Sequence, residues 1–370
     1  MKISKYLLFF ALFSVIFIVG CEDTEGENEG ETEAFDRREM LANWADNIIV
    51  PSYINYRNSL QELVAKKDNF LQDSNESTYS ELTTAWLDAY KNWQHVSMFE
   101  IGKAESIGLR NFTNIYPSDV SLIEQNINTQ SYNLELPSNF DAQGFPALDY
   151  LLFGIAEGDE LIFEKLGEGN YSKYLDDLIT RLFTLTDLVT EDWINRYSAE
   201  FIDNDGSSAT ASVDKMVNDF LFYNEKFLRA GKVGIPSGVF SGNKISSAVE
   251  APYAGQYSKV LFLESLDAVE NFFNGRHVGS VTTGVSLKSY LDHIRTQNGG
   301  SDIANDITAE WDSARLKTQV LSDNFMTQIE DDNIKMRELY DELQKAIVLM
   351  KVDMMQALNI QVDFIDADGD

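Results

Sequence analysis

Apolar residues recur at helical spacing along most of the chain. Stripes of Leu, Trp, Tyr, Ile and Met repeat every three to five positions and cover residues 41–63, 82–96, 174–193, 213–228, 257–273 and 339–358. This spacing places the apolar side chains on one face of a helix, where they pack into a core. Alternating runs that indicate strands are scarce. The pattern therefore predicts an all-α fold, with Pro51 kinking or restarting the first helix.

Two interruptions of this pattern divide the chain. Residues 203–212 are small and polar, which is typical of a linker. We therefore predict two helical-bundle halves packed together, at residues 37–200 and 213–370, joined by a linker at 201–212. A second stretch, from Gly231 to Gly255, is rich in glycine and proline. It predicts a long structured loop between helices of the second half, and such loops are often functional.

The N-terminus has the features of an export signal. Lys2 and Lys5 precede an almost wholly apolar run at residues 7–19, and Gly20 then precedes Cys21, the single cysteine. This order predicts a signal peptide at residues 1–20 and lipid attachment to Cys21. The alternative, an uncleaved anchor helix, needs about 20 apolar residues. Residues 21–36 are strongly acidic and predict a disordered tether. We expect a lipid-anchored protein of the cell envelope, most simply of the outer membrane.

The charge balance narrows the range of partners. The chain has 29 basic and 60 acidic residues, for a net charge of −31. Nucleic acid is therefore excluded as an expected partner, and anionic lipid is a poor one. Membrane contact is expected through the lipid on Cys21. A cationic ligand or a metal ion is compatible with this charge, and so is a role in solubility alone.

Catalytic motifs are scarce in this chain. We expect His95 to be packed or at the surface, and His277 and His293 to be exposed. No zinc-protease motif, phosphate-binding loop or nucleophile elbow occurs. The acidic runs at 203–214 and 366–370 begin like calcium loops but lack the later ligands, which favours solvated acidic loops.

Three segments together resemble imelysin-like proteins. They are residues 143–154, residues 229–238 with 249–253, and residues 86–102 with 116–119. The closing residues 357–370 resemble the tails of members from the Bacteroidota. The acidic run after Cys21 is similar to export signals of surface lipoproteins from the same phylum, which favours surface exposure. The resemblance implies an all-helical fold of two halves with a site between them. It also implies an envelope location, a link to iron uptake with envelope uptake proteins as partners, and classification among metallopeptidases.

The chain departs from the family motif Gly-x-His-x-x-Glu at its ligands. Gly144 matches the motif glycine, whereas Pro146 replaces the histidine and Asp149 replaces the glutamate. Proline has no donor atom, so Asp149 is the remaining candidate metal ligand. The alternative is that Asp149 is an acid favoured by the start of a helix. The resemblance places the candidate ligand-binding residues at Gly144, Pro146, Asp149, Gly231, Pro236 and Glu250.

These departures favour a binding protein over an enzyme. A metallopeptidase needs a bound metal and an activated water, and the histidine for this is missing. We expect a non-enzymatic protein related to iron or metal uptake, with a weakly bound metal or a chelated metal as ligand. Free iron should bind weakly or not at all, and Pro146→His with Asp149→Glu should tighten its binding. The alternatives are a metal-dependent peptidase and a structural or adhesive surface lipoprotein.

Overall fold

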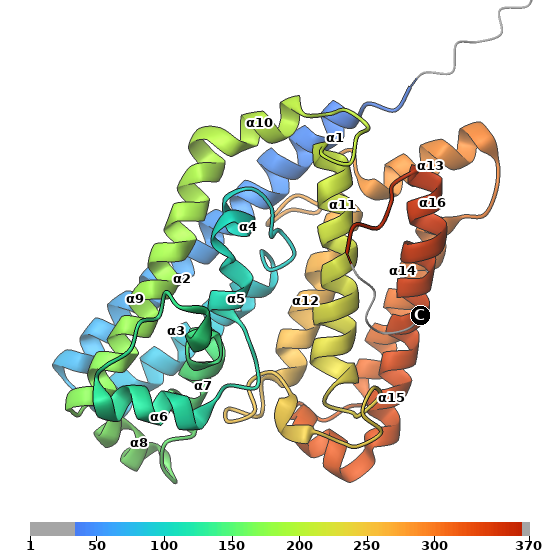
Figure 1. Ribbon diagram of the computed structural model, residues 1–370. Coiled ribbons are helices and arrows are strands. Elements are labelled where there is room, and N and C mark those ends of the chain that lie inside the picture. The colour runs from blue at the N-terminus through green and yellow to red at the C-terminus, as the bar shows by residue number, and fades with distance from the viewer. Residues whose placement is uncertain (1–33, 365–370) are drawn as a thin grey trace, which may run out of the picture. The chain divides into compact units, whose positions relative to one another are not determined.

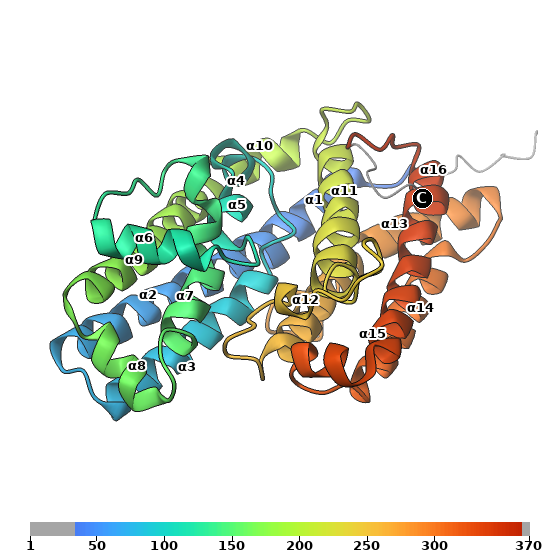
Figure 2. The ribbon, with the colours of Figure 1, turned by 60° about the horizontal axis from the view of Figure 1, so that its bottom comes forward.

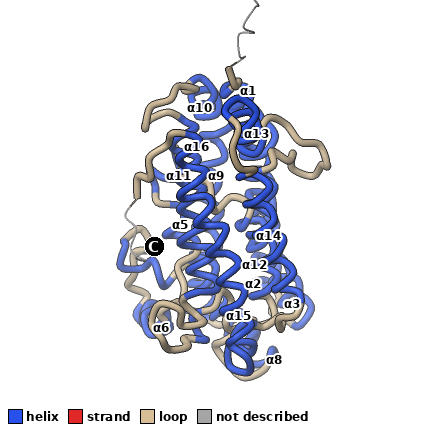
Figure 3. Tube along the Cα trace, turned by 90° about the vertical axis from the view of Figure 1, so that its right-hand side faces the viewer, coloured by secondary structure: helices blue, strands red, loops and turns tan. Residues whose placement is uncertain are grey.

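The computed structural model describes residues 34–364, and most of these residues are helical (Figure 1). Cys21, the signal peptide, most of the tether and the acidic run at 366–370 lie outside the described residues. Within residues 34–364 there is no strand, only an isolated bridge between Arg276 and Thr283 (Figure 3). The predicted all-α fold is confirmed. No helix in this range is long and apolar enough to cross a membrane.

The helices fall into two groups along the chain. The first group contains α1 (Arg37–Asn43), the π-helical η1 (Trp44–Ile49), α2 (Val50–Gln72), α3 (Glu76–Gln94), α4 (Lys103–Ile107), α5 (Leu109–Thr113), α6 (Val120–Thr129), the 3₁₀ segment η2 (Pro137–Ala142), α7 (Gly144–Phe153), α8 (Asp159–Leu166), α9 (Gly169–Asp192), the π-helical η3 (Trp193–Tyr197) and α10 (Ser198–Asp203). The second contains α11 (Ser212–Phe222), the π-helical η4 (Tyr223–Gly234), the 3₁₀ turn η5 (Ser246–Ala248), α12 (Ser258–Phe273), α13 (Leu287–Asn298), α14 (Ile303–Gln319), α15 (Phe325–Val348), the π-helical η6 (Leu349–Met354) and α16 (Met355–Leu358).

The two groups of helices pack on each other. In the first group α2 lies against α3 and α9, and in the second α15 lies against α14 and η4. Contacts of α3 with α12, and of α1 with α11, join the groups (Figures 1 and 2). Residues 35–364 belong to one compact unit with a continuous apolar core. The loop between α10 and α11 lies within the predicted linker at 201–212, and the division of the chain into two bundle halves stays a prediction.

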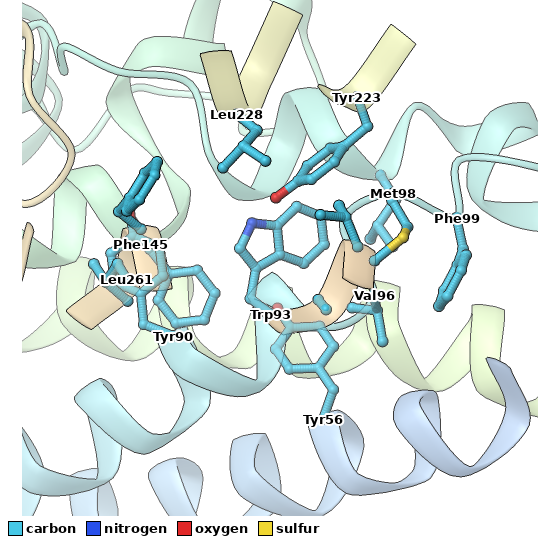
Figure 4. Packing of buried hydrophobic residues seen from close by; sticks show 14 of the residues in the cluster. Tyr56, Tyr90, Trp93, Val96, Met98, Phe99, Phe145, Tyr223, Leu228 and Leu261 are labelled. Atoms are coloured by element: carbon cyan, nitrogen blue, oxygen red, sulfur yellow. The ribbon is translucent and has the colours of Figure 1, made fainter. Parts of the chain in front are cut away.

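Aromatic side chains from several helices meet in this core. Figure 4 shows the Trp93 ring of α3 between Tyr56 of α2 and Tyr223 of η4. The rings of Trp93 and Tyr56 have centroids 5.7 Å apart. Tyr90 stacks on Phe145 of α7 with centroids 4.3 Å apart. The tryptophan-rich stripe of the sequence is therefore core packing, and it fixes α7 against α3.

The break predicted at Pro51 takes an unexpected form. The backbone stays helical from α1 into α2, and the irregularity is the π-helical η1 directly before the proline. Proline has no N–H to donate to the carbonyl four residues earlier, which belongs to Asn47. That carbonyl instead accepts a hydrogen bond of 3.0 Å from the N–H of Val278. The proline thus supplies an attachment point for a distant loop.

The second predicted break begins later than expected. Residues 231–234 belong to η4, whose buried residues include three charged side chains, Glu225, Arg229 and Lys232. The irregular segment runs from Ile235 to Tyr257 and contains only the short turn η5. The glycines of η4 therefore did not end the helix, because η4 is buried against α11, α12 and α15 and tertiary packing overrides their weak helix propensity.

Candidate functional site

The motif segment forms α7, one of the most buried helices of the molecule. Its first residue, Gly144, has φ of +74°, and a Cβ there would lie 2.1 Å from the Thr113 carbonyl oxygen. Only glycine fits both the conformation and the contact. Pro146 is buried in the first turn, where its missing N–H costs nothing. The glycine and the proline therefore shape the start of α7.

Asp149 is fully buried and is occupied by backbone groups. Its Oδ2 accepts a hydrogen bond of 3.0 Å from the N–H of Tyr253, and its Oδ1 accepts one of 2.9 Å from the N–H of Ala254. Burial raises the pKa of Asp149 to about 7, against the lowering effect of these two bonds. Asp149 therefore fastens the 249–254 segment to α7.

Glu250, in the same segment, is at the centre of a buried polar network. It forms an ion pair with Lys232 of η4, and both side chains are almost fully buried. Its Oε1 accepts hydrogen bonds from Gln94 Nε2 at 3.1 Å and from Asn114 Nδ2 at 2.8 Å. A buried charge pair is tolerated only when further hydrogen bonds satisfy it, as they do here.

The remaining polar atoms of this network are also engaged. Gln94 Oε1 accepts hydrogen bonds from Lys232 Nζ at 3.0 Å and from Ser265 Oγ at 2.7 Å. Asn114 Oδ1 accepts one of 2.6 Å from the hydroxyl of Tyr90. The network thus joins α3, η4, α12 and the 249–254 segment.

Little space is left beside this network. The adjoining cavity, whose lining includes Gln94, Asn114, Tyr116 and Lys232, has a volume of about 10 Å³. That is room for about one water molecule. Among residues 34–364, no three His, Cys, Asp or Glu side chains converge closely enough to hold a metal ion. The site as it stands is a filled polar core.

Comparison with known proteins identifies the family. The sequence model of the imelysin family, Peptidase M75, matches residues 49–350. The chain belongs to the imelysin family. Iron-regulated protein A of Synechococcus elongatus is 23% identical over 128 residues, which is 35% of each chain. The match thus spans about a third of that relative.

Two solved structures share the fold of this imelysin-family chain. One is described as an iron-regulated protein A precursor from Parabacteroides distasonis, with a TM-score of 0.71 and 16% identity, covering 87% of this chain and 96% of that one. The other is an imelysin-like protein from Psychrobacter arcticum, with a TM-score of 0.66 and 18% identity, covering 89% and 97%. The identities are low, so the likeness concerns the fold.

Gly231 and Pro236, the other two predicted site residues of this imelysin-family chain, have backbone roles. A Cβ on Gly231 would lie 3.2 Å from the Tyr116 hydroxyl oxygen, so the glycine allows a close approach beside Lys232. Pro236 is buried just beyond η4, and its carbonyl accepts a hydrogen bond of 2.9 Å from the N–H of Ile245. Neither residue offers a side-chain donor to a ligand.

The sequence reasoning missed three members of the network: Gln94, Asn114 and Lys232. The motif search concentrated on α7, whereas these residues come from α3, η4 and the segment after α5. One signal was present, since Gln94 lies within the apolar stripe at 82–96 and Lys232 follows four residues, one helical turn, after Leu228 at the end of the stripe at 213–228. A charged or amide side chain in that position must find a buried partner.

The exposure of the histidines and of the acidic run at 203–214 was predicted only in part. His95 is half-buried, and its Nε2 lies 2.9 Å from a carboxylate oxygen of Glu264. His277 and His293 are half-buried rather than exposed, and His293 packs against the ring of Phe35 at 5.6 Å. The ring of Phe35 covers His293, and His277 belongs to the 275–284 segment, which is hydrogen-bonded to η1. Asp203, at the end of α10, is exposed and pairs with Arg38 at 2.6 Å, as expected of a solvated acid, whereas Asp214 is buried in the first turn of α11.

Proposed function

We propose that this imelysin-family protein is a non-enzymatic, lipid-anchored envelope protein that binds a ligand connected with iron. The link to iron is supported by the names of its relatives in the cyanobacterium and in Parabacteroides. The anchor is supported by the signal-like N-terminus and by Cys21. An outer-membrane location, with envelope uptake proteins as partners, follows from the same reasoning.

One observation carries the non-enzymatic part of the proposal: the motif positions are committed to structural roles. Pro146 supplies no donor atom, and both oxygens of Asp149 accept backbone N–H groups. Glu250 is neutralised by Lys232. A catalytic metal needs several protein ligands and an open position for water. Metal binding by these carboxylates would require breaking the hydrogen bonds and the ion pair that hold the 249–254 segment.

Calorimetric titration and a protease assay test this proposal. We expect the purified mature protein to show no tight stoichiometric binding of free ferric iron or zinc, and no cleavage of unfolded protein substrates. A strain lacking the protein should grow more slowly than its parent when iron is limiting. Cleavage that requires a metal, and is lost with a chelator and in Asp149→Ala, would establish the peptidase instead.

The variant carrying Pro146→His and Asp149→Glu provides a further comparison. The sequence motif alone predicts that it binds iron more tightly than the wild type. The full burial of Asp149 and its hydrogen bonds to the N–H groups of Tyr253 and Ala254 predict little gain, because a longer carboxylate must displace the 249–254 segment. A clear gain in affinity would mean that the pocket opens easily.

A further inference from the structure

A second and much larger cavity lies on another part of the molecule. It has a volume of about 410 Å³ and is bounded by the end of η1, α2, the end of α3, α12 and the 276–281 loop. This volume falls in the range of small-molecule sites. None of the motif residues of α7 lines it. It is therefore separate from the filled polar core.

The chemistry of its lining differs from that of the whole protein. Acidic residues outnumber basic ones by 60 to 29 in the chain, yet no Asp or Glu from residues 34–364 lines this cavity. The polar lining includes Arg276, His277, His95 and three asparagines, Asn55, Asn92 and Asn271. A cation would find no carboxylate here, whereas an anion would find a guanidinium, imidazoles and amide N–H groups.

The wall that carries Arg276 and His277 is held in place from α1 and η1. The side chain of Asn43 donates hydrogen bonds to the carbonyls of Gly275, at 3.2 Å, and Val285, at 3.0 Å. The carbonyl of Asn47, which Pro51 leaves available, accepts from the N–H of Val278. Both ends and the middle of this wall are thus fixed, which preorganises the cavity.

Arg276 is oriented but has no carboxylate partner. Its Nε donates a hydrogen bond of 2.8 Å to the carbonyl of Ser280, across the turn of the loop. No carboxylate within residues 34–364 lies within ion-pair distance of it. A guanidinium held in this way presents its terminal N–H groups as a fork that matches a carboxylate.

His277 contributes a second unsatisfied group. Its backbone N–H is bonded to the carbonyl of Thr282 at 2.9 Å, which fixes the residue. Its ring Nε2 is buried and has no hydrogen-bond partner among the described side chains and backbone. Because this atom has almost no solvent-accessible surface, a ligand oxygen reaches it only when the imidazole turns toward the cavity, and such a bond recovers the free energy that an unpartnered buried polar atom costs.

The adjoining surface limits where negative charge can sit. A neighbouring cavity of about 420 Å³ shares Asn92 and His95 with the first, and its charged lining consists of three acids, Glu62, Asp88 and Glu264, and one base, Lys91. These carboxylates repel an anion. The His95–Glu264 pair therefore marks the border, and an anion is confined to the side of Arg276 and His277.

We infer that this cavity binds a small organic anion with two or three carboxylates, either free or as the organic shell of a ferric chelate. Arg276 takes one carboxylate, and His277 and the asparagine amides take other oxygens. The inference rests on the proposed iron-linked binding function and deepens it, because it names the ligand class. It also explains how a protein whose motif site is filled could still bind iron in chelated form.

Calorimetric titration of the mature protein with citrate, ferric citrate and sorbitol tests the inference. We expect citrate or ferric citrate to bind with one-to-one stoichiometry and the neutral polyol sorbitol not to bind. The anion that binds more tightly shows whether the ligand is the free organic anion or its ferric chelate. Absence of binding by both anions, or equal binding of sorbitol, would overturn the inference.

Two variants locate the site. Arg276→Gln keeps a donor for the Ser280 carbonyl but removes the charge, and it should weaken binding roughly tenfold or more. Arg337→Gln, an exposed arginine of α15 outside this lining, makes the same charge change and should leave the affinity unchanged. His277→Gln should also weaken binding while the melting temperature stays near that of the wild type.

The outcomes separate this inference from the proposed function. Binding of ferric citrate that Arg276→Gln and His277→Gln leave intact would overturn the site, while the iron-linked function would stand. No binding of either anion, with slow growth of the deletion strain under iron limitation, would overturn the ligand class alone. No binding and no growth defect would overturn both.

Discussion

The role of Asp149 as a fastener of the 249–254 segment makes a quantitative prediction. Asp149→Ala removes the acceptor for the N–H groups of Tyr253 and Ala254. Each N–H left without an acceptor costs about 1–3 kcal/mol, and the lower end applies where water can reach it. Tyr253 is 40% exposed, so water reaches this segment. We therefore expect the free energy of unfolding to fall by roughly 2–4 kcal/mol near pH 5.

The contribution of Asp149 to the free energy of unfolding should decrease as the pH rises. Burial raises the pKa of Asp149 from 3.8 to about 7. Between these values the folded protein holds a proton that the unfolded chain has lost, so the wild type loses stability as the pH rises from 4 to 7. This difference in pKa between the folded and unfolded states corresponds to up to about 4 kcal/mol. Asparagine does not titrate, so the stability of Asp149→Asn should not show this pH dependence. The free energy of unfolding of the wild type should therefore fall relative to that of Asp149→Asn as the pH rises from 4 to 7.

Urea unfolding followed by circular dichroism at pH 5, 6, 7 and 8 measures both effects. The cost of Asp149→Ala should be largest at pH 5 and should shrink toward pH 8. The exposed Asp46 provides the control, since Asp46→Asn should change stability little at any pH. A difference between wild type and Asp149→Asn that stays constant from pH 5 to 8 would refute the reasoning, because the carboxylate would then not be desolvated.

Three further predictions concern single residues. Lys232→Met should lower the free energy of unfolding by about 3–5 kcal/mol in urea titrations, since it leaves the Glu250 charge buried, and adding Glu250→Gln should restore part of the loss. Gly144→Ala should lower the melting temperature far more than Gly158→Ala, because both glycines have positive φ but only the first faces a backbone carbonyl. Cys21→Ser should abolish incorporation of labelled palmitate, and retained label would contradict lipidation.

Much of the fold could be predicted because helices depend on local pattern. The apolar stripes became buried helix faces, and the polar run near residue 206 became the loop between α10 and α11. Asn75 and Ser286 cap the starts of α3 and α13 with their own side chains, a signal that is also local. Such features need only neighbours in sequence, so the sequence contains them directly.

The roles of the site residues could be predicted only in part. The motif comparison identified Asp149 and Glu250 as belonging to one region, and the 249–254 segment does join them. It could not show that backbone N–H groups and Lys232 already occupy both carboxylates, since these partners lie far away along the chain. Whether a side chain faces a ligand or a neighbour is decided by the fold.

The sequence by itself determined the helical class, the positions of most helices and the loss of the motif histidine at Pro146, and it predicts an export signal at the N-terminus. Each of these depends on residue type and short-range spacing. Only the tertiary structure decided that the motif region is a filled polar core and that a cavity lined by Arg276 and His277, with no Asp or Glu of residues 34–364, lies beside the 276–281 loop. Only the tertiary structure shows that the Asn47 carbonyl accepts a hydrogen bond from the N–H of Val278. The physical reason is that burial, charge pairing and cavity volume depend on side chains brought together from distant segments, and no local pattern records that convergence.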